Sequence, residues 1–263
     1  MNLTNIKIGI VGFGIVGQAI HHAFSKQNHT ITYYDKFLSE TGSLDQLVDT
    51  DCVFVCVPTD TVDQTCDVSV VESIVESLSN LKYSGLIIIK STVIPGTTQR
   101  LMTEWPLLRL CFVPEFLRQE FAVSDFIDET HTLIVGTTNT TDFKFVEQLH
   151  YPYAHSAIQV SPTEAELTKY FVNNHNSMRI TFANAYYEVC DQLGADYQAV
   201  LKAATTRPSI GHGYYLQCND HQRGFSGKCL PKDLVAFSTL TKQLNLNLNL
   251  FDAIINDNTK FIK

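Results

Sequence analysis

The sequence predicts an α/β protein in which a doubly wound parallel sheet is followed by an all-helical part, joined by one long helix. Two observations predict this order. Short apolar runs rich in β-branched residues alternate with segments of helical periodicity over residues 1–158, as in sheets built from βαβ units. Helical periodicity then continues through residues 159–263. We expect two domains with these bounds, and six strands at 6–11, 30–35, 52–57, 86–89, 110–113 and 132–136.

The first predicted strand leads into a glycine-rich loop. Residues 12–17 have the form GxGxxG and precede a helical segment, and the next strand ends in Asp35. Such glycines permit a tight turn and close approach to a pyrophosphate, which the helix N-terminus attracts, while the acid binds a ribose diol. The pattern predicts a Rossmann-like domain that prefers NAD over NADP, a preference that the neighbouring Lys36 weakens. A glycine-rich turn without a nucleotide is the alternative.

Further cofactor contacts are expected where other strands end, because ligands of doubly wound sheets bind at the carboxyl ends of strands. Pro58 and Thr59 follow the third strand, and Ser91 and Thr92 follow the fourth. For the last two, helix capping or a turn is an equal alternative. The residues expected to contact NAD are Gly12, Phe13, Gly14, Ile15, Val16, Gly17, Asp35, Lys36, Pro58, Thr59, Ser91 and Thr92.

The second half begins with a helix of about 30 residues. Ser161 and Glu164 have the spacing of a capping box, and Gly194 is a natural helix end. Lys169 and Asn173 are four residues apart and share a face of this helix. A lone helical lysine is usually a solvated charge. Asparagines weaken helices, however, so the run N-N-H-N from Asn173 onward suggests a polar site.

Composition limits the classes of function. The chain has 263 residues and a net charge of −8, which disfavours a general nucleic-acid or membrane-surface binder. Its apolar runs are too short for a membrane helix, and its N-terminus lacks the features of a signal peptide. The seven cysteines include no CxxC pair and no zinc-like spacing. We therefore expect reduced thiols in a cytoplasmic protein and no bound metal.

One cysteine lies in the stretch GFSGKCLPKD at residues 224–233. With this motif and five others in the same order, the chain resembles the nucleotide-sugar 6-dehydrogenases, which act on UDP-glucose or GDP-mannose. The other stretches are GFGIVG at 12–17, VCVPTD at 55–60, KSTVIPGTT at 90–98, VPEFLRQ at 113–119 and AELTKYFVNN at 165–174. The resemblance implies oxidation of a sugar CH₂OH to a carboxylate in two NAD-linked steps, with UDP-glucose as the first candidate.

The resemblance also implies roles for individual residues. Cys229 would attack an aldehyde to form a thiohemiacetal, whose oxidation gives a thioester that water hydrolyses. Lys169 and Asn173 would stabilise negative charge on the substrate oxygen. Asp233 with Thr92 would position the water, and Glu115 would act as an acid–base or water-orienting group. The residues expected at the sugar are Glu115, Phe116, Leu117, Arg118, Lys169, Asn173, Tyr214, Tyr215, Leu216 and Ser226.

The chain departs from the pattern of this family at several points. Ser226 replaces a glycine, Gln119 replaces a glutamate, and the family's Arg-Ile-Gly is Ser-Ile-Gly at 209–211, where Arg207 or Arg223 is a candidate replacement for the arginine. Family members carry a third, C-terminal domain that completes the nucleotide-sugar site. This sequence stops where the central domain would end, so we expect a short form whose base-recognition surface is missing or rebuilt.

Two other functions fit parts of the pattern. A single-step β-hydroxyacid dehydrogenase shares the sheet, the long helix and the helical lysine, but it needs no cysteine. A non-catalytic NAD-binding relic or partner protein would explain the changes at Ser226 and Gln119, but not the retention of Cys229 and Lys169. For the leading hypothesis we expect a nucleotide-sugar substrate, no nucleic-acid or membrane partner, and a homodimer formed through the long helix.

Overall fold

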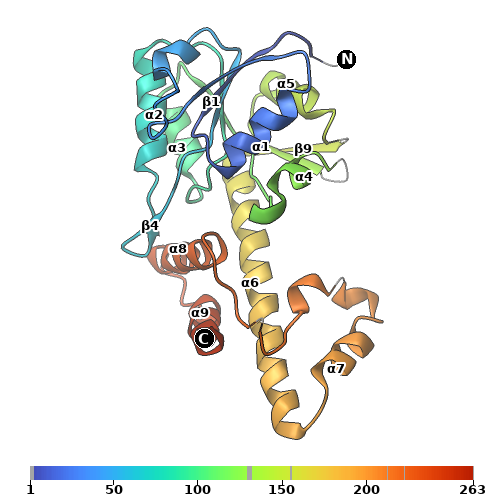
Figure 1. Cartoon of the computed structure of the whole chain (residues 1–263). Coiled ribbons are helices and arrows are strands. Elements are labelled where there is room, and N and C mark those ends of the chain that lie inside the picture. Colours follow the sequence, from blue (N-terminus) through green and yellow to red (C-terminus); the bar gives the residue numbers. More distant parts are fainter. Residues whose placement is uncertain (1–2, 129–131, 155, 212, 222, 263) are drawn as a thin grey trace. The chain divides into compact units, whose positions relative to one another are not determined.

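The computed structural model describes residues 3–128, 132–154, 156–211, 213–221 and 223–262 (Figure 1). The chain forms two compact units. The first unit comprises residues 1–60 and 67–169, and the second comprises residues 61–66 and 170–263.

A seven-stranded sheet forms the centre of the first unit. Its strands are β1 (Lys7–Val11), β2 (Thr30–Tyr34), β3 (Cys52–Val55), β6 (Leu86–Ile89), β7 (Arg109–Phe112), β8 (Thr132–Gly136) and β9 (Ser156–Val160). They are arranged in the order β2-β1-β3-β6-β7-β8-β9, and the strands from β2 to β7 are parallel. The chain order reverses between β1 and β3, which is the switch point where such sheets bind ligands. The predicted doubly wound α/β fold is confirmed.

The prediction of six parallel strands is wrong in two respects. β8 pairs with β7 in the antiparallel direction, with Phe112 opposite Gly136, and β9 is a seventh strand that runs parallel to β8. β9 lies at the edge of the sheet, and its side chains are exposed or half-buried. It therefore lacks the continuous apolar run by which the inner strands were identified.

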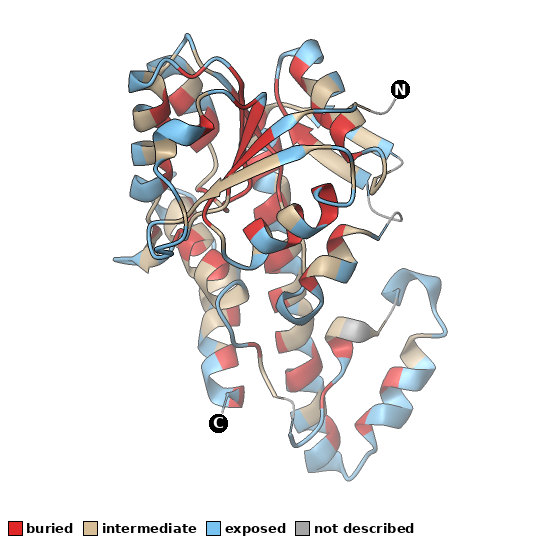
Figure 2. Ribbon diagram, turned by 45° about the horizontal axis from the view of Figure 1, so that its top comes forward, coloured by how far each residue is buried: buried red, intermediate tan, exposed pale blue. Residues whose placement is uncertain are grey.

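Helices cover both faces of this sheet. One core contains Phe24 of α1 (Ile15–Phe24), residues of α4 (Ala122–Phe126) and Val146 of α5 (Thr140–His150). The core on the other face contains Val75 of α2 (Ser69–Asn80) and Leu101 of α3 (Thr97–Glu104). The inner strands are buried between these layers (Figure 2). Short 3₁₀ turns at Leu44–Leu47 and Gln119–Phe121 complete the unit.

The long helix α6 runs from Pro162 to Leu193 and has 32 residues. Its predicted capping box is confirmed: the Ser161 amide donates to Glu164 Oε2 at 2.7 Å, and the Glu164 amide donates to Ser161 Oγ at 3.3 Å. The helix ends before Gly194, whose φ of +65° is the left-handed conformation that glycine adopts at helix C-termini. Both predicted ends of the helix are therefore correct.

A buried carboxylate fixes the first turns of α6 within the first unit. Glu166 is fully buried, and its two oxygens accept hydrogen bonds from the Gly96 amide at 2.6 Å and the Thr98 amide at 2.8 Å. These amides lie at the start of α3, where N–H groups lack helical partners and the helix dipole favours a negative charge. The Glu166 side chain on α6 thus caps the N-terminus of α3, and these hydrogen bonds explain how a buried acid is tolerated.

The second unit is mainly helical. It contains α7 (Tyr197–Ala204), α8 (Leu230–Gln243), α9 (Leu250–Phe261) and 3₁₀ turns at Pro208–Ile210 and Tyr214–Leu216. A hairpin of β4 (Thr61–Val62) and β5 (Thr65–Cys66) belongs to it and packs against α8. The hairpin was not predicted because its turn residues, Asp63 and Gln64, adopt positive φ without the Asn-Gly signature of such turns. Within the described residues, the helices are too short or too polar to cross a membrane.

The Glu166 contact predicts a loss of stability on substitution. We expect Glu166→Gln to lower the free energy of unfolding by about 1–3 kcal/mol, because one backbone N–H then faces an NH₂ group and loses its acceptor. Urea denaturation measures this change. Glu76→Gln, at an exposed position of α2, is the matched control and should shift stability by less than about 0.5 kcal/mol. Equal stability of the two variants would contradict the assignment.

The same contact predicts a pH dependence. Burial raises the pKa of Glu166, although its hydrogen bonds to Thr98 and Gly96 act in the opposite direction. A group whose pKa is higher in the folded protein than in the unfolded chain stabilises the fold fully at pH values below its unfolded-state pKa. This stabilisation is lost as the pH rises through its folded-state pKa. The stability difference between the wild type and Glu166→Gln should therefore narrow as the pH rises from the ordinary carboxyl range towards neutrality.

Candidate active site

The glycine loop between β1 and α1 has the geometry of a phosphate-binding turn. Gly12 has a φ of +88°, and a Cβ there would lie 2.6 Å from the Cys56 carbonyl oxygen. A Cβ on Gly17 would lie 2.1 Å from the Gly12 carbonyl oxygen. A Cβ on Gly14, in contrast, would meet no described atom within 4 Å. Gly12 and Gly17 therefore allow close packing, and Gly14 leaves open space at the start of α1.

This open space suits a dinucleotide. Gly14 is the N-cap residue of α1 and gives its helix no side-chain cap, so the amides of Ile15 and Val16 are available to an anion. Asp35 follows β2, and its carboxylate accepts hydrogen bonds from the amides of Phe13 at 2.7 Å and Phe37 at 2.9 Å. The acid is thus held against the glycine loop. The neighbouring Lys36 is exposed.

The predicted residues at the ends of β3 and β6 have different surroundings. Thr59 is buried, whereas Pro58 is exposed and Thr92 is half-buried. The Ser91 hydroxyl is bonded to the carbonyls of Val55 at 3.2 Å and Val57 at 2.7 Å. This side chain ties the end of β6 to the end of β3, which supports the structural alternative considered for Ser91.

Two lysines meet at Glu115, which follows β7. Lys90 Nζ lies 2.9 Å from Glu115 Oε2, and both groups are largely buried. Lys169 Nζ, from α6, donates to the Glu115 carbonyl oxygen at 2.5 Å and lies 5.0 Å from the centre of the Phe116 ring. Glu115 Oε1 accepts from the Phe116 amide at 2.9 Å. Lys169 is therefore a buried, positioned cation and not a solvated charge. Lys90 was not predicted as a partner of Glu115, because the two residues meet only through the register of β6 against β7, which the sequence does not show.

The residues after Glu115 are mostly held by local contacts. Arg118 forms an ion pair with Asp125 at 2.6 Å and lies over the Phe121 ring. Leu117 is half-buried and packs against the core of the first unit. Gln119 begins the 3₁₀ turn and is exposed.

In the second unit, the cysteine turn at residues 224–229 is held by two buried asparagines. Asn258 of α9 binds Phe225 twice: its Oδ1 accepts from the Phe225 amide at 2.8 Å, and its Nδ2 donates to the Phe225 carbonyl at 2.9 Å. Asn184 Oδ1, on α6, accepts from the Gly224 amide at 3.1 Å and from Arg223 Nε at 2.8 Å. Sequence reasoning missed both asparagines, since their spacing along the chain gives no signal.

Cys229 itself is exposed at the end of this turn, immediately before α8. Asp233, one helical turn later, is 1% exposed. Its Oδ2 accepts from Asn173 Nδ2 at 2.5 Å, and its Oδ1 is paired with Lys232 Nζ at 2.7 Å. The structure thus brings Asn173 and Asp233 together as neighbours within the second unit. Ser226 is exposed, so its side chain causes no packing conflict.

Exposure distinguishes Cys229 from the other cysteines. Burial raises the pKa of Cys56 to about 12 and also raises the pKa values of the Cys52, Cys111 and Cys218 thiols. The thiolate is the reactive form, so these buried groups are poor nucleophiles near neutral pH. Cys190 is 6% exposed. Among the seven cysteines, all of which the structure describes, Cys229 alone is therefore exposed.

The remaining predicted residues lie on the loop after α7. Leu216 is buried, and Tyr215 lies beneath the Arg179 guanidinium at 6.0 Å. The side chain of Tyr214 lies outside what the structure describes. Arg223 is paired with Glu188 and packs over Tyr187, so its guanidinium already serves a structural network. Among the residues that the structure describes, no group of three or more His, Cys, Asp or Glu side chains could hold a metal ion.

Comparisons with known proteins agree with this geometry. Residues 34–154 match the description "UDP-glucose/GDP-mannose dehydrogenase family, NAD binding domain", and residues 163–260 match the central domain of the same family. The UDP-glucose 6-dehydrogenase of Rickettsia bellii is 27% identical, over 98% of this chain and 67% of that protein.

Solved structures show the same fold. A UDP-glucose dehydrogenase from Pyrobaculum islandicum superposes with a TM-score of 0.88 at 24% identity, covering 97% of this chain and 68% of that one. A 3-hydroxyisobutyrate dehydrogenase from Mycobacterium tuberculosis superposes with a TM-score of 0.79 at 15% identity, covering 98% and 94% of the two chains. At these identities, the likeness is one of fold alone.

The asparagine contacts predict how the cysteine turn responds to substitution. Asn258→Ala leaves the buried amide and carbonyl of Phe225 without partners, so we expect a loss of about 1–3 kcal/mol in stability. We also expect faster hydrogen exchange of the Phe225 amide, measured by mass spectrometry. Asn256→Ala, at an exposed position of the same helix, is the control and should leave exchange unchanged. Unchanged exchange in both variants would contradict a clamp at Asn258.

Proposed function

Because the chain belongs to the UDP-glucose/GDP-mannose dehydrogenase family and is thus an NAD-dependent nucleotide-sugar dehydrogenase, we propose that it oxidises C6 of the sugar twice, to the uronic acid. UDP-glucose is the proposed substrate, since relatives at 23–30% identity are named UDP-glucose 6-dehydrogenases. The observation that carries the two-step proposal is the exposed Cys229, which is followed one turn later by the buried Asp233.

The proposed chemistry balances as two oxidations and one hydrolysis. The CH₂OH group first loses a hydride and a proton to give an aldehyde. The Cys229 thiol adds to the aldehyde carbon, forming a thiohemiacetal. Loss of a second hydride and proton gives a thioester, and water then cleaves its C–S bond to release the carboxylic acid and the thiol. Bound NAD supplies the hydride acceptor, once for each oxidation, so two NAD are reduced for each acid formed.

The geometry of the glycine loop supports NAD at this position. The amides at the start of α1 and the open space at Gly14 would receive the pyrophosphate. Asp35 would accept hydrogen bonds from the adenine ribose, exchanging its present contact with the Phe13 amide for the ribose hydroxyls.

The remaining polar groups receive roles according to their charge. Lys169 and Asn173 would donate to the oxygen on which negative charge develops. Asp233 and Thr92 would hold the hydrolytic water, and Glu115 would accept a hydrogen bond from it. The sugar contacts proposed are Glu115, Phe116, Leu117, Arg118, Lys169, Asn173, Tyr214, Tyr215, Leu216 and Ser226.

We also propose that the protein is a homodimer that associates through α6. One face of this helix carries exposed apolar side chains, including Phe171 (73% exposed), Phe182 (55%) and Leu193 (77%). Together with Met178 and Val189, they are separated by seven or four residues, which places them on one side of the helix, as in a coiled-coil seam. An apolar stripe of this length is usually covered by a partner. The nucleophilic thiol must stay reduced, which favours a cytoplasmic location.

The cysteine mechanism predicts a stoichiometry. Wild-type protein should form two NADH for each uronic acid, measured by absorbance at 340 nm and product chromatography with UDP-glucose, GDP-mannose and N-acetylated UDP-hexosamines. Cys229→Ala should form no acid, because no thioester can form. Cys190→Ala, which removes a buried thiol, should keep the two-to-one ratio. Acid formation by Cys229→Ala, or one NADH per product in the wild type, would refute the proposal and favour a single oxidation.

The α6 stripe predicts an effect on assembly. Phe182→Glu places a charge in the middle of the proposed seam, so we expect it to convert a dimer into a monomer at micromolar concentration. Light scattering coupled to gel filtration measures the mass. Asp191→Ala, which changes one charge on the other side of the same helix, should remain dimeric. A monomeric wild type, or a dimeric Phe182→Glu variant, would contradict association through this stripe.

A further inference from the structure

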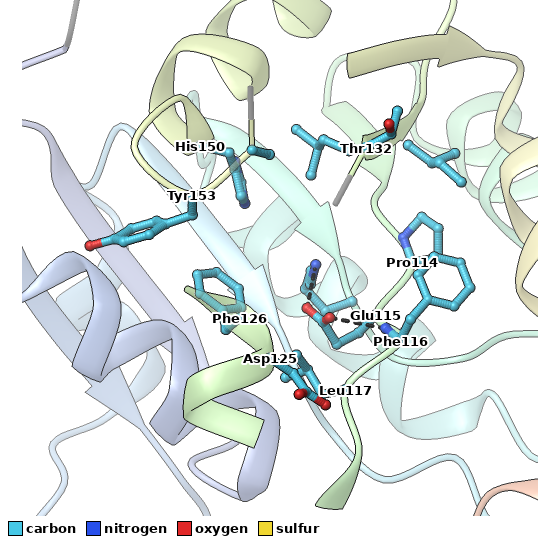
Figure 3. A pocket seen from close by; sticks show the side chains of 13 residues that line it. Pro114, Glu115, Phe116, Leu117, Asp125, Phe126, Thr132, His150 and Tyr153 are labelled. Carbon is cyan, nitrogen blue, oxygen red and sulfur yellow. Dashed lines mark hydrogen bonds and ion pairs between the residues drawn. The ribbon is translucent and has the colours of Figure 1, made fainter. Parts of the chain in front are cut away.

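A cavity of about 80 Å³ lies within the first unit, beside Glu115 (Figure 3). Its walls come from the segment after β7, from α4, from the start of β8 and from the end of α5. Apolar groups such as Phe126 and Ile134 form part of the lining. The polar groups that concern us are His150, Lys90 and Glu115.

His150 presents an unpaired nitrogen in this region. The residue is 3% exposed, and its Nδ1 lies 2.8 Å from the Val146 carbonyl oxygen. Since a carbonyl can only accept, Nδ1 carries the proton, and Nε2 is a hydrogen-bond acceptor. Nε2 is buried and has no partner among the described residues. Most buried polar atoms do have one, so an orphan beside a cavity points to a bound hydrogen-bond donor.

Burial, with a smaller effect of nearby charge, keeps this histidine neutral. Burial lowers the pKa of His150 to about 3, and the positive charge of Lys90 acts in the same direction. The rings of Phe24 and Phe54 pack edge-on against it, at 5.4 Å and 5.9 Å between ring centres. A neutral imidazole in these surroundings offers one acceptor and no second donor. The partner of Nε2 must therefore donate a hydrogen bond.

We propose that the cavity is a water site in which ordered water donates to His150 Nε2 and connects it to the Lys90–Glu115 pair. The volume exceeds the roughly 30 Å³ that one water occupies in the liquid. A buried water typically needs two to four polar partners. His150 Nε2 supplies an acceptor, the Lys90 ammonium supplies donors besides the one directed at Glu115 Oε2, and the Glu115 carboxylate supplies further lone pairs.

This site gives His150 a positioning role, an inference that rests on the proposed function. Glu115 is the residue proposed to accept from the hydrolytic water, and the cavity holds water against the same carboxylate. Hydrolysis of the thioester consumes one water in each turnover, whereas the two oxidations consume none. The cavity water, ordered by His150, is therefore a local supply that affects hydrolysis and leaves the oxidations unchanged.

The structural arm of the test does not depend on activity. A crystal structure of the full chain at about 1.2 Å resolution should contain water within hydrogen-bond distance of His150 Nε2. ¹⁵N NMR of the histidine ring should find the neutral Nδ1–H tautomer with a hydrogen-bonded Nε2. In His150→Leu the water next to residue 150 should be absent. A dry cavity, or an Nε2 that bears the proton, would overturn the proposal.

The kinetic arm separates positioning from folding. In His150→Leu we expect kcat to fall about 10- to 100-fold, since misplacing a reacting group by about 1 Å costs up to 10²-fold. The rapid first formation of two NADH per site, followed by stopped flow, should keep its rate and amplitude. His150→Gln, whose amide places an acceptor near the position of Nε2, should recover most of kcat. His22→Leu, at an exposed position of α1, is the control and should match the wild type.

The outcomes distinguish the two proposals. A burst that slows in parallel with kcat in His150→Leu, or a failure of His150→Gln to recover activity, would show a merely structural histidine and overturn the positioning role. A wild type that forms no NADH with any nucleotide sugar would refute the proposed function instead. In that case the crystal and NMR measurements still decide whether the cavity holds ordered water.

Discussion

The hydrogen bonds from Gly96 and Thr98 to the Glu166 carboxylate fix the first turns of α6 within the first unit, and other features of this unit depend on their position. Lys169 lies about one helical turn after Glu166, or about 5 Å further along the helix axis. From this position its ammonium group reaches the carbonyl of Glu115. Without the anchor, the ammonium group would lose its register relative to the end of β7. The raised pKa of Glu166 shows that burial of its charge is only partly offset by the two amides. The anchor therefore has an energetic cost, and in return it fixes the position of Lys169.

At the cysteine turn the anchoring residues are buried but the anchored side chain is exposed, whereas both Glu166 and Lys169 are buried. Its anchoring atoms, on Asn184 and Asn258, are buried, whereas the Cys229 thiol is exposed. An amide side chain suits this role because it can satisfy a backbone N–H and a backbone C=O at once without adding charge. In the proposed mechanism, the thiol must be reached by a substrate and released again after hydrolysis, while its backbone must not move. Two neutral clamps behind an exposed thiol suit both requirements.

The sequence predicted features that depend on local order along the chain. The glycine loop, Asp35 at the end of β2, the capping box of Ser161 and the stop at Gly194 are all read from neighbouring residues, and each lies as expected. Features that depend on distant residues were missed. The Lys90–Glu115 pair needs the register of β6 against β7, and the Asn258 clamp joins residues 33 positions apart. Strand β9 was missed for a different reason, since an edge strand needs no buried run. The roles given to Cys229 and Asp233 still depend on the resemblance.

Glu115 contributes to the proposed chemistry through both its backbone and its side chain. Its carbonyl oxygen positions the Lys169 ammonium, which would stabilise charge during the oxidations. Its carboxylate offers about four lone-pair sites, and Lys90 and the Phe116 amide occupy two of them. In the proposed mechanism, the other lone pairs accept from the cavity water beside His150 and from the hydrolytic water. A displacement of this one residue would therefore disturb the oxyanion donor and the water supply together. The ion pair with Lys90, buried beneath it, is the contact that resists such a displacement.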